Sequence, residues 1–432
     1  MNATQTASIL VPETEEPIRA ELFSLERLEQ HAETLAAAQT LTADARRGRP
    51  LIPRVVENGR VLLATYRAIA GAVQSEQPIT PAAEWLVDNF HIVDEQLREI
   101  QEDLPVGYYR KLPKLAAGHL EGYPRVYGVA WAFVAHTDSR FDPEALRRFV
   151  AAYQRVQPLT IGELWAMAIT LRVVLVENLR RIAERLVRTR DARMEADALA
   201  DHLLGSNQPG AILPALKRFE KAPLERAFAV QLIQRLRDLD PNVRPVLEWL
   251  DQRLSAAGTS ADDIVRAELQ EQGAMSVTVR NVITSMRSIS AFDWQTFFEG
   301  VSLVDEILRE DTRFAEMDFS TRDDYRHAIE DLSRGSKYTE LEVAKRVVRR
   351  AKQAVPDPRV APHNGDKPAE DRRCEPGYYL IAQGRPGFER ELGFRSDLKH
   401  RLLRAKEQQK NPNQRARTGS QYSSAAYFDL YF

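Results

Sequence analysis

The strongest constraint on the fold is one stretch of helical periodicity that begins near residue 160 and continues to about residue 190. Its start has the pattern of a capping box, because the Thr160 hydroxyl and the Glu163 carboxylate can each accept a hydrogen bond from a free backbone N–H group. Apolar residues then recur three or four positions apart: Leu164, Ala168, Leu171, Leu175, Leu179, Ile182 and Leu186. We expect other helices to cover this apolar seam.

Similar patterns fill most of the chain, and few segments show the alternation that is typical of strands. We expect helices over residues 18–40, 51–73, 80–104, 129–136, 142–158, 163–190, 193–204, 211–219, 223–238, 243–256, 260–272, 292–309, 321–334 and 338–354. Residues 276–290 alternate enough to leave a strand open, although their neighbours favour a helix. The sequence therefore predicts an all-α protein, a multi-helix bundle or array.

The chain is long enough, at 432 residues, to divide into two or more folded units. Its composition changes over residues 355–376, where five prolines predict a linker. The predicted organisation is a disordered tail (1–17), an N-terminal helical domain (18–158), a second helical domain (159–354), the Pro-rich linker (355–376), a short helical segment (377–404) and a polar, disordered tail (405–432).

Composition excludes several classes of protein. The 60 basic and 62 acidic residues give a net charge of −2, which argues against a nucleic-acid partner. Cys374 is the single cysteine, so neither an intrachain disulfide nor a cysteine-built metal site is expected. The first residues lack the pattern of a secretory signal, and no apolar run reaches the roughly 18 residues of a membrane span. We expect a soluble chain in a reducing cytosol.

Residues 104–127 predict a loop that is rich in tyrosine and arginine, since Pro105 and Gly107 end the preceding helix. Tyrosine and arginine are favoured where protein surfaces dock. One interpretation is a packed loop that closes the end of a helical bundle. The other is a contact surface formed by Tyr108, Tyr109, Arg110, Tyr123, Arg125 and Tyr127.

Charged residues on the long helix give a second candidate site. Arg172 could pair with Glu177 or with another helix, and the spacing of Glu177 and Arg181 is that of a solvated ion pair. Five arginines between residues 180 and 190 make the end of this helix basic. The alternative is an anion site, for phosphate or acidic lipid, formed by Arg172, Arg181 and Arg185.

Familiar catalytic motifs are absent from the sequence, including the phosphate-binding loop, the nucleophile elbow and the His-Glu-x-x-His pair. One Asp-x-Asp pair occurs, at Asp238 and Asp240. Such a pair can hold a divalent cation, but here it closes a predicted helix before Pro241, where Asp is a common turn residue. No metal site is therefore predicted.

Eight short stretches occur in the order found in one family of bacterial enzymes. They are Pro17–Ser24, Glu84–Phe90, Leu104–Arg110, Gly122–Tyr127, Pro158–Trp165, Phe292–Trp294, Met317–Asp323 and Gly377–Ile381. Together they resemble the N-terminal region of cyclic β-1,2-glucan synthases, and the resemblance extends from about residue 17 to residue 404. Eight stretches in one order are far more specific than any single stretch.

The resemblance implies part of a large inner-membrane enzyme that transfers glucose from UDP-glucose into a β-1,2-linked chain, with a divalent metal as cofactor. In that family the transferase core, the membrane spans and the phosphorylase-like domains follow the region matched here, so they are the implied partners. This chain lacks the family's Gln-x-x-Arg-Trp element. The resemblance thus implies a non-catalytic fragment at the cytoplasmic face of the inner membrane.

Two further functions remain open at this point. The chain could be a stand-alone helical interaction protein that docks partners through the aromatic loop. It could also be an anion- or nucleotide-binding module that uses Arg172 and the arginines of residues 180–190.

Overall fold

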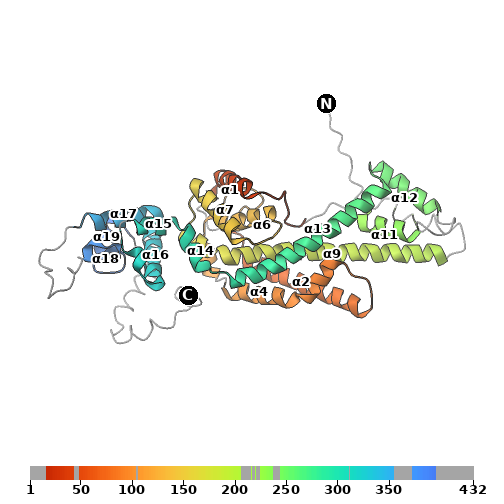
Figure 1. Cartoon of the computed structure of the whole chain (residues 1–432), viewed down its shortest axis with the longest axis horizontal. Helices are drawn as coiled ribbons and strands as arrows, with labels where there is room; N and C mark the ends of the chain where they lie inside the picture. Colours follow the sequence, from red (N-terminus) through yellow and green to blue (C-terminus); the bar gives the residue numbers. More distant parts are fainter. Residues whose placement is uncertain are drawn as a thin grey trace, which may run out of the picture.

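The computed structural model describes residues 16–42, 48–103, 106–205, 224–236, 244–310, 312–354 and 372–395, together with the single residues 216 and 219. Helices form nearly all of its regular structure, which confirms the predicted all-α class (Figure 1). In this part of the chain the strands are limited to β1 (Leu41–Thr42) and β2 (Lys114–Leu115), which form a short antiparallel pair.

The helices before residue 166 follow the predicted pattern, except that one predicted helix is divided and that a short helix lies in the predicted loop of residues 104–127. They are α1 (Leu25–Ala38), α2 (Leu51–Gln74), α3 (Pro81–Asp88), α4 (Phe90–Asp103), α5 (Val106–Lys111), α6 (Arg125–His136), α7 (Pro143–Val156) and α8 (Ile161–Trp165). Side chains of Thr80, Asp142 and Thr160 cap α3, α7 and α8 as predicted. The helix predicted over 80–104 is divided at Asn89, whose side-chain amide donates to the Trp85 carbonyl oxygen at 2.9 Å.

The middle of the chain is dominated by two long helices. They are α9 (Met167–Gly205) and α13 (Ala261–Ala291), and the shorter α11 (Arg226–Leu236) and α12 (Arg244–Ala256) lie between them in sequence. The helices predicted over 163–190 and 193–204 are thus one helix after Ala166, and residues 260–272 and 276–290 are also one helix, which resolves the strand ambiguity. At 39 residues, α9 is about 58 Å long.

The C-terminal helices lie beyond α14 (Trp294–Val301), at the opposite end of the molecule from α11 and α12 (Figure 1). They are α15 (Leu303–Arg309), α16 (Phe319–Arg334), α17 (Glu340–Lys352), α18 (Pro376–Leu380) and α19 (Arg385–Leu392), with the 3₁₀ turns η5 (Phe314–Glu316) and η6 (Arg372–Cys374). The helix predicted over 292–309 is interrupted at Ser302, which caps α15. The turn η6 lies within residues 355–376, where the sequence predicts the linker.

Two hydrophobic cores organise these helices. The main core contains buried residues of α1–α9, of the second half of α13 and of α14–α19. The smaller core joins residues 192–203 of α9 to α11, α12 and Ile264 of α13. The boundary predicted at residue 158 does not separate the cores. Instead, α9 and α13 pack against each other and run through both.

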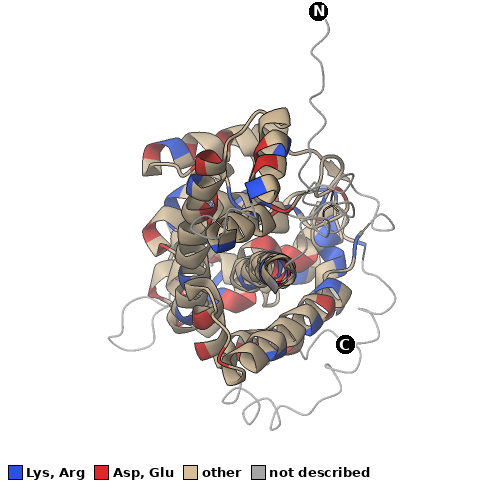
Figure 2. Cartoon of the chain, turned by 90° about the vertical axis from the view of Figure 1, so that its right-hand side faces the viewer, with Lys and Arg blue, Asp and Glu red and all other residues tan. Residues whose placement is uncertain are grey.

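The arrangement around α9 explains why this helix is so long. It packs against α2, α4, α6, α11 and α13. In Figure 2, which looks along the molecule, the central helix is seen end-on with other helices around it, and acidic and basic positions are interspersed over the ribbons. None of the helices in the described ranges combines the length and the apolar character that crossing a membrane requires.

Several predicted segments lie outside the described residues. They are residues 1–15 of the N-terminal tail, most of the helix predicted over 211–219, the pair Asp238 and Asp240, residues 355–371 of the linker and residues 396–432.

Candidate functional site

A buried carboxylate on α9 is the centre of a cluster of polar side chains from two helices. The side chain of Glu177 accepts hydrogen bonds from Arg54 Nε at 2.9 Å and Asn58 Nδ2 at 2.8 Å on α2. It also accepts from Arg180 Nη2 at 3.0 Å and Arg181 Nε at 2.8 Å on its own helix. Burial acts to raise the pKa of Glu177, but hydrogen bonds from Arg54 and Arg181 outweigh it and lower the pKa to about 2. Glu177 is therefore an anion that ties α2 to α9.

The pair of Glu177 and Arg181 has the spacing predicted from the sequence, but it is not solvated. Both side chains are largely buried, and Arg172 pairs elsewhere, with Glu99 of α4 at 3.1 Å. Arg185 forms an ion pair with Glu271 of α13. The three arginines of the predicted anion site thus pair with carboxylates on three helices: Arg172 on α4, Arg185 on α13 and Arg181 within α9.

Next to this cluster the structure brings together residues from both predicted sites. The ring of Tyr123 lies 5.0 Å from that of Tyr127, which lies 5.9 Å from that of Trp131. The guanidinium of Arg181 lies over the Trp131 ring at 4.9 Å, and that of Arg49 lies over Tyr123 at 5.6 Å. The result is a row of three aromatic rings that are tilted against one another, with a cation over the ring at each end.

The aromatic segment is mainly a packed structure and not an exposed surface. Tyr109, Arg125 and Tyr127 are buried, Tyr123 is partly buried and Arg110 is exposed; Tyr108 lies within α5. Burial raises the pKa of Tyr109 and of Tyr127, so both phenols stay neutral at physiological pH. Burial thus removes Tyr109, Arg125 and Tyr127 from the exposed surface of the chain, whereas Arg110 stays on it.

Arg125 is the clearest correction, because it starts α6 and faces inward. Its Nε donates to Glu163 Oε1 at 2.8 Å, its Nη2 contacts Glu163 Oε2, and Nη2 also donates to the Pro158 carbonyl oxygen at 2.9 Å. The side chains are 2% and 0% exposed. Glu163 simultaneously completes the capping box by accepting from the Thr160 N–H at 2.9 Å. One carboxylate thus fixes the start of α8 and neutralises a buried arginine.

The other side of α8 faces the C-terminal helices. Its first backbone N–H, at Ile161, donates to Glu340 of α17 at 2.7 Å. Burial raises the pKa of Glu340 to about 8, and Glu330 and Glu163 act in the same direction. The Trp165 ring stacks on Phe298 of α14 at 4.4 Å. These contacts make α8 the junction between the main helices and the C-terminal ones.

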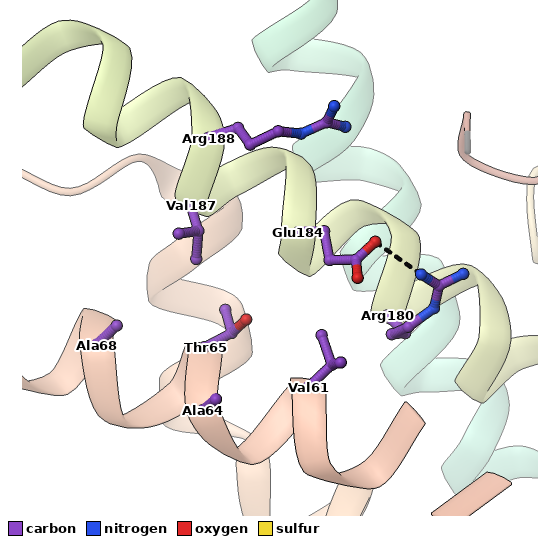
Figure 3. A pocket seen from close by; sticks show the side chains of 8 residues that line it. All are labelled: Val61, Ala64, Thr65, Ala68, Arg180, Glu184, Val187 and Arg188. Carbon is purple, nitrogen blue, oxygen red and sulfur yellow. Dashed lines mark hydrogen bonds and ion pairs between the residues drawn. The ribbon is translucent and has the colours of Figure 1, made fainter. Parts of the chain in front are cut away.

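Sequence reasoning missed a cleft between α2 and α9, because it depends on how two distant helices pack. The cleft has a volume of about 860 Å³ and is lined by Val61, Ala64, Thr65, Ala68, Arg180, Glu184, Val187 and Arg188 (Figure 3). The spacing of Val61, Ala64 and Ala68 on one face of α2 was the available signal. Among the described residues no group of three His, Cys, Asp or Glu side chains could hold a metal ion.

The fold and these contacts define an all-α region in which buried charged side chains join one helix to the next. The comparison with known proteins agrees with the resemblance seen in the sequence. The chain is 34% identical over 409 residues to cyclic beta-(1,2)-glucan synthase NdvB of Rhizobium meliloti (strain 1021). The match covers 94% of this chain but 14% of that protein. The predicted resemblance is confirmed, and the chain is a glucan synthase-related region. No protein-family model matches it.

Proposed function

We propose that this chain is a non-catalytic scaffold of a cyclic β-1,2-glucan synthase, on the cytoplasmic side of the inner membrane. In this proposal the transferase and membrane parts of the enzyme are its partners, and UDP-glucose and a divalent metal bind to the transferase part. The single observation that carries the scaffold role is the continuity of α9 and α13 through both hydrophobic cores.

A helix that is buried in two cores resists bending between them, because a bend would unpack one core or the other. The two long helices are also joined by ion pairs. Arg193 of α9 pairs with Glu268 of α13 at 2.8 Å, and Glu271 of α13 pairs with both Arg185 of α9 and Arg226 of α11. Charges that hold helices together are the arrangement a rigid spacer requires.

The assignment of this spacer to a glucan synthase rests on the 34% identity to the Rhizobium meliloti protein. The cytoplasmic side is supported by the single cysteine in 432 residues, a composition that suits a reducing compartment. The buried aromatic segment offers little surface to a docking partner, so the stand-alone interaction protein has no observation in its favour.

A chimera tests the scaffold role. This chain replaces the matching region of the Rhizobium meliloti synthase, and cyclic glucan is measured in cells that lack their own synthase. We expect the chimera to restore glucan. A Gly-Gly-Ser-Gly insertion after Thr189, between the two cores, should then lower glucan at least about tenfold at unchanged protein level. The same insertion after Glu76, in the exposed turn that follows α2, is the matched control.

Two results would contradict the proposal. Equal glucan from the two insertion variants would show that the continuity of α9 is irrelevant to the enzyme. Incorporation of labelled glucose from UDP-glucose by the isolated chain would show that it is catalytic. Limited proteolysis of both variants distinguishes a flexible α9 from an unfolded chain.

A further inference from the structure

The cleft between α2 and α9 combines an apolar wall with unsatisfied polar groups. Val61, Ala64 and Ala68 of α2 form one wall, and Val187 of α9 points toward them from the other side (Figure 3). The volume of about 860 Å³ lies within the range of roughly 300–1,000 Å³ that is usual for small-molecule sites. Shape and lining are therefore those of a site for a small, largely apolar ligand.

One side chain of the cleft is mostly buried, and its hydroxyl has no partner among the described residues. Thr65 is 4% exposed, and its hydroxyl has no hydrogen bond to any residue that the structure describes. The Thr65 side chain rises from α2 on the side that faces α9 in Figure 3. The oxygen is not one of the fully buried polar atoms that lack a partner, so it opens into the cleft, where a ligand can form a hydrogen bond to it.

The charges at the two ends of the cleft are not equivalent. At one end, Arg180 is bound by Glu184 at 2.7 Å and by Glu177 at 3.0 Å. At the other end, about 12 Å along α9, Arg188 forms no ion pair or hydrogen bond within the described part of the chain. Arg188 is thus a cation available to an anionic group, and a guanidinium binds carboxylate or phosphate oxygens well.

We propose that this cleft binds a single-chain anionic amphiphile in its free, monomeric form. The apolar chain lies along Val61, Ala64, Ala68 and Val187, and the Thr65 hydroxyl donates to its carboxylate or phosphate group. The Arg188 guanidinium, which extends over α9 in Figure 3, pairs with the same group after its side chain rotates into the cleft. The apolar wall excludes a fully polar ligand such as free phosphate, since nothing on it replaces the ligand's bonds to water. Because Arg188 lies at one end of the cleft, the charged group of the ligand lies at that end and its apolar chain runs toward the other.

Decanoate is the probe, titrated into the full chain by isothermal calorimetry below its micelle concentration. We expect one decanoate to bind per chain. Arg188→Gln should weaken binding about tenfold or more, because a hydrogen-bonded charge pair is lost. Arg67→Gln, on α2 but outside the cleft lining, should leave the affinity unchanged. Ala64→Phe, at an exposed position of α2, should abolish binding by filling the cleft.

Thr65→Val separates a ligand-binding role from a structural one. The substitution keeps the shape of the side chain and removes a hydroxyl that has no partner in the protein. We expect decanoate to bind about three- to tenfold more weakly while the midpoint of thermal unfolding stays equal or rises. A lower midpoint with unchanged affinity would mean that the hydroxyl stabilises the fold, and it would overturn the proposed contact.

Three controls decide the chemical class and the source of the ligand. Decanol should bind more weakly than decanoate; equal affinity would overturn the role of Arg188. Inorganic phosphate should not bind, and phosphate binding as tight as that of decanoate would overturn the role of the apolar wall. Vesicles of phosphatidylglycerol test a membrane surface as the source, and binding to vesicles without binding to monomeric decanoate would overturn the site.

Discussion

The buried pair of Arg125 and Glu163 gives the most demanding test of how the fold is held together. We expect Arg125→Met to lower the free energy of unfolding by about 3–5 kcal/mol, because the substitution leaves the Glu163 carboxylate buried without its cation. The contacts that are lost are two to Glu163 and one to the Pro158 carbonyl oxygen. The side chains are almost inaccessible to water, so water cannot replace these contacts.

The double variant Arg125→Met with Glu163→Gln isolates the unpaired charge. Glutamine can still accept the Thr160 N–H that completes the capping box, but it carries no charge that needs a partner. The double variant should therefore be more stable than Arg125→Met alone, and the coupling energy of the pair should reach about 2–3 kcal/mol. Urea denaturation followed by circular dichroism measures Arg125→Met, Glu163→Gln and the double variant, because the coupling energy requires both single variants.

An exposed ion pair in the same region is the matched control. Arg140 lies 3.5 Å from Asp142, and the side chains are 72% and 39% exposed. Arg140→Met should change the free energy of unfolding by less than about 1 kcal/mol, since an exposed pair is screened by water. If Arg125→Met lowers the free energy of unfolding by less than about 1 kcal/mol, or if the effects of the two substitutions are additive, Arg125 and Glu163 do not stabilise α8 as a buried ion pair.

Further variants test other contacts by thermal unfolding. The pKa of Glu340 rises to about 8 in the folded chain, so between about pH 4.5 and 8 the folded state keeps a proton that the unfolded state has lost. Stability therefore falls by a few degrees in the unfolding midpoint as the pH increases over this range, and Glu340→Gln should remove the fall. The pKa of Glu177 falls to about 2, so the ionised carboxylate stabilises the fold above pH 4.5 and this stabilisation is lost as the pH falls from about 4.5 to 2. Glu177→Gln should lower the free energy of unfolding by about 3–5 kcal/mol at neutral pH and remove the loss of stability in acid. A methyl group at Gly377 would lie 2.0 Å from the Tyr325 hydroxyl, so Gly377→Ala should destabilise the C-terminal helices by about 1–3 kcal/mol. At Gly273, in the middle of α13, there is open space, and Gly273→Ala should stabilise the chain by up to about 1 kcal/mol.

Local features of this fold could be predicted because their causes lie within a few residues. The capping box at Thr160 needs only a hydroxyl and a carboxylate three positions apart, and both contacts form. The break at Asn89 could not be predicted in the same way. Its side chain bonds to the Trp85 carbonyl oxygen and also accepts from Arg287 of α13, almost 200 residues away in sequence. A partner this distant leaves no signal in the local pattern.

The same limit explains the outcome for the candidate sites. Tyrosines and arginines between residues 104 and 127 have the composition of a docking surface, and composition does not reveal which of them face inward. Arg125 is buried because Glu163, 38 positions later, neutralises it. The cleft between α2 and α9 depends on the packing of helices that are more than a hundred residues apart, so the small residues of α2 alone did not predict it.

The stretches that carry the resemblance to glucan synthases acquire a physical meaning at α8. Arg125 from the stretch 122–127 is hydrogen-bonded to Glu163 from the stretch 158–165. The centroid of the Trp165 ring lies 6.2 Å from that of Phe319, in the stretch 317–323. On its other side α8 is held by Glu340. Because this five-residue helix contacts both groups of helices, a rotation of the C-terminal helices against the helices before α8 must break one of these contacts. Contacts among these stretches therefore fix how the C-terminal helices meet the helices before α8, through buried and specific partners.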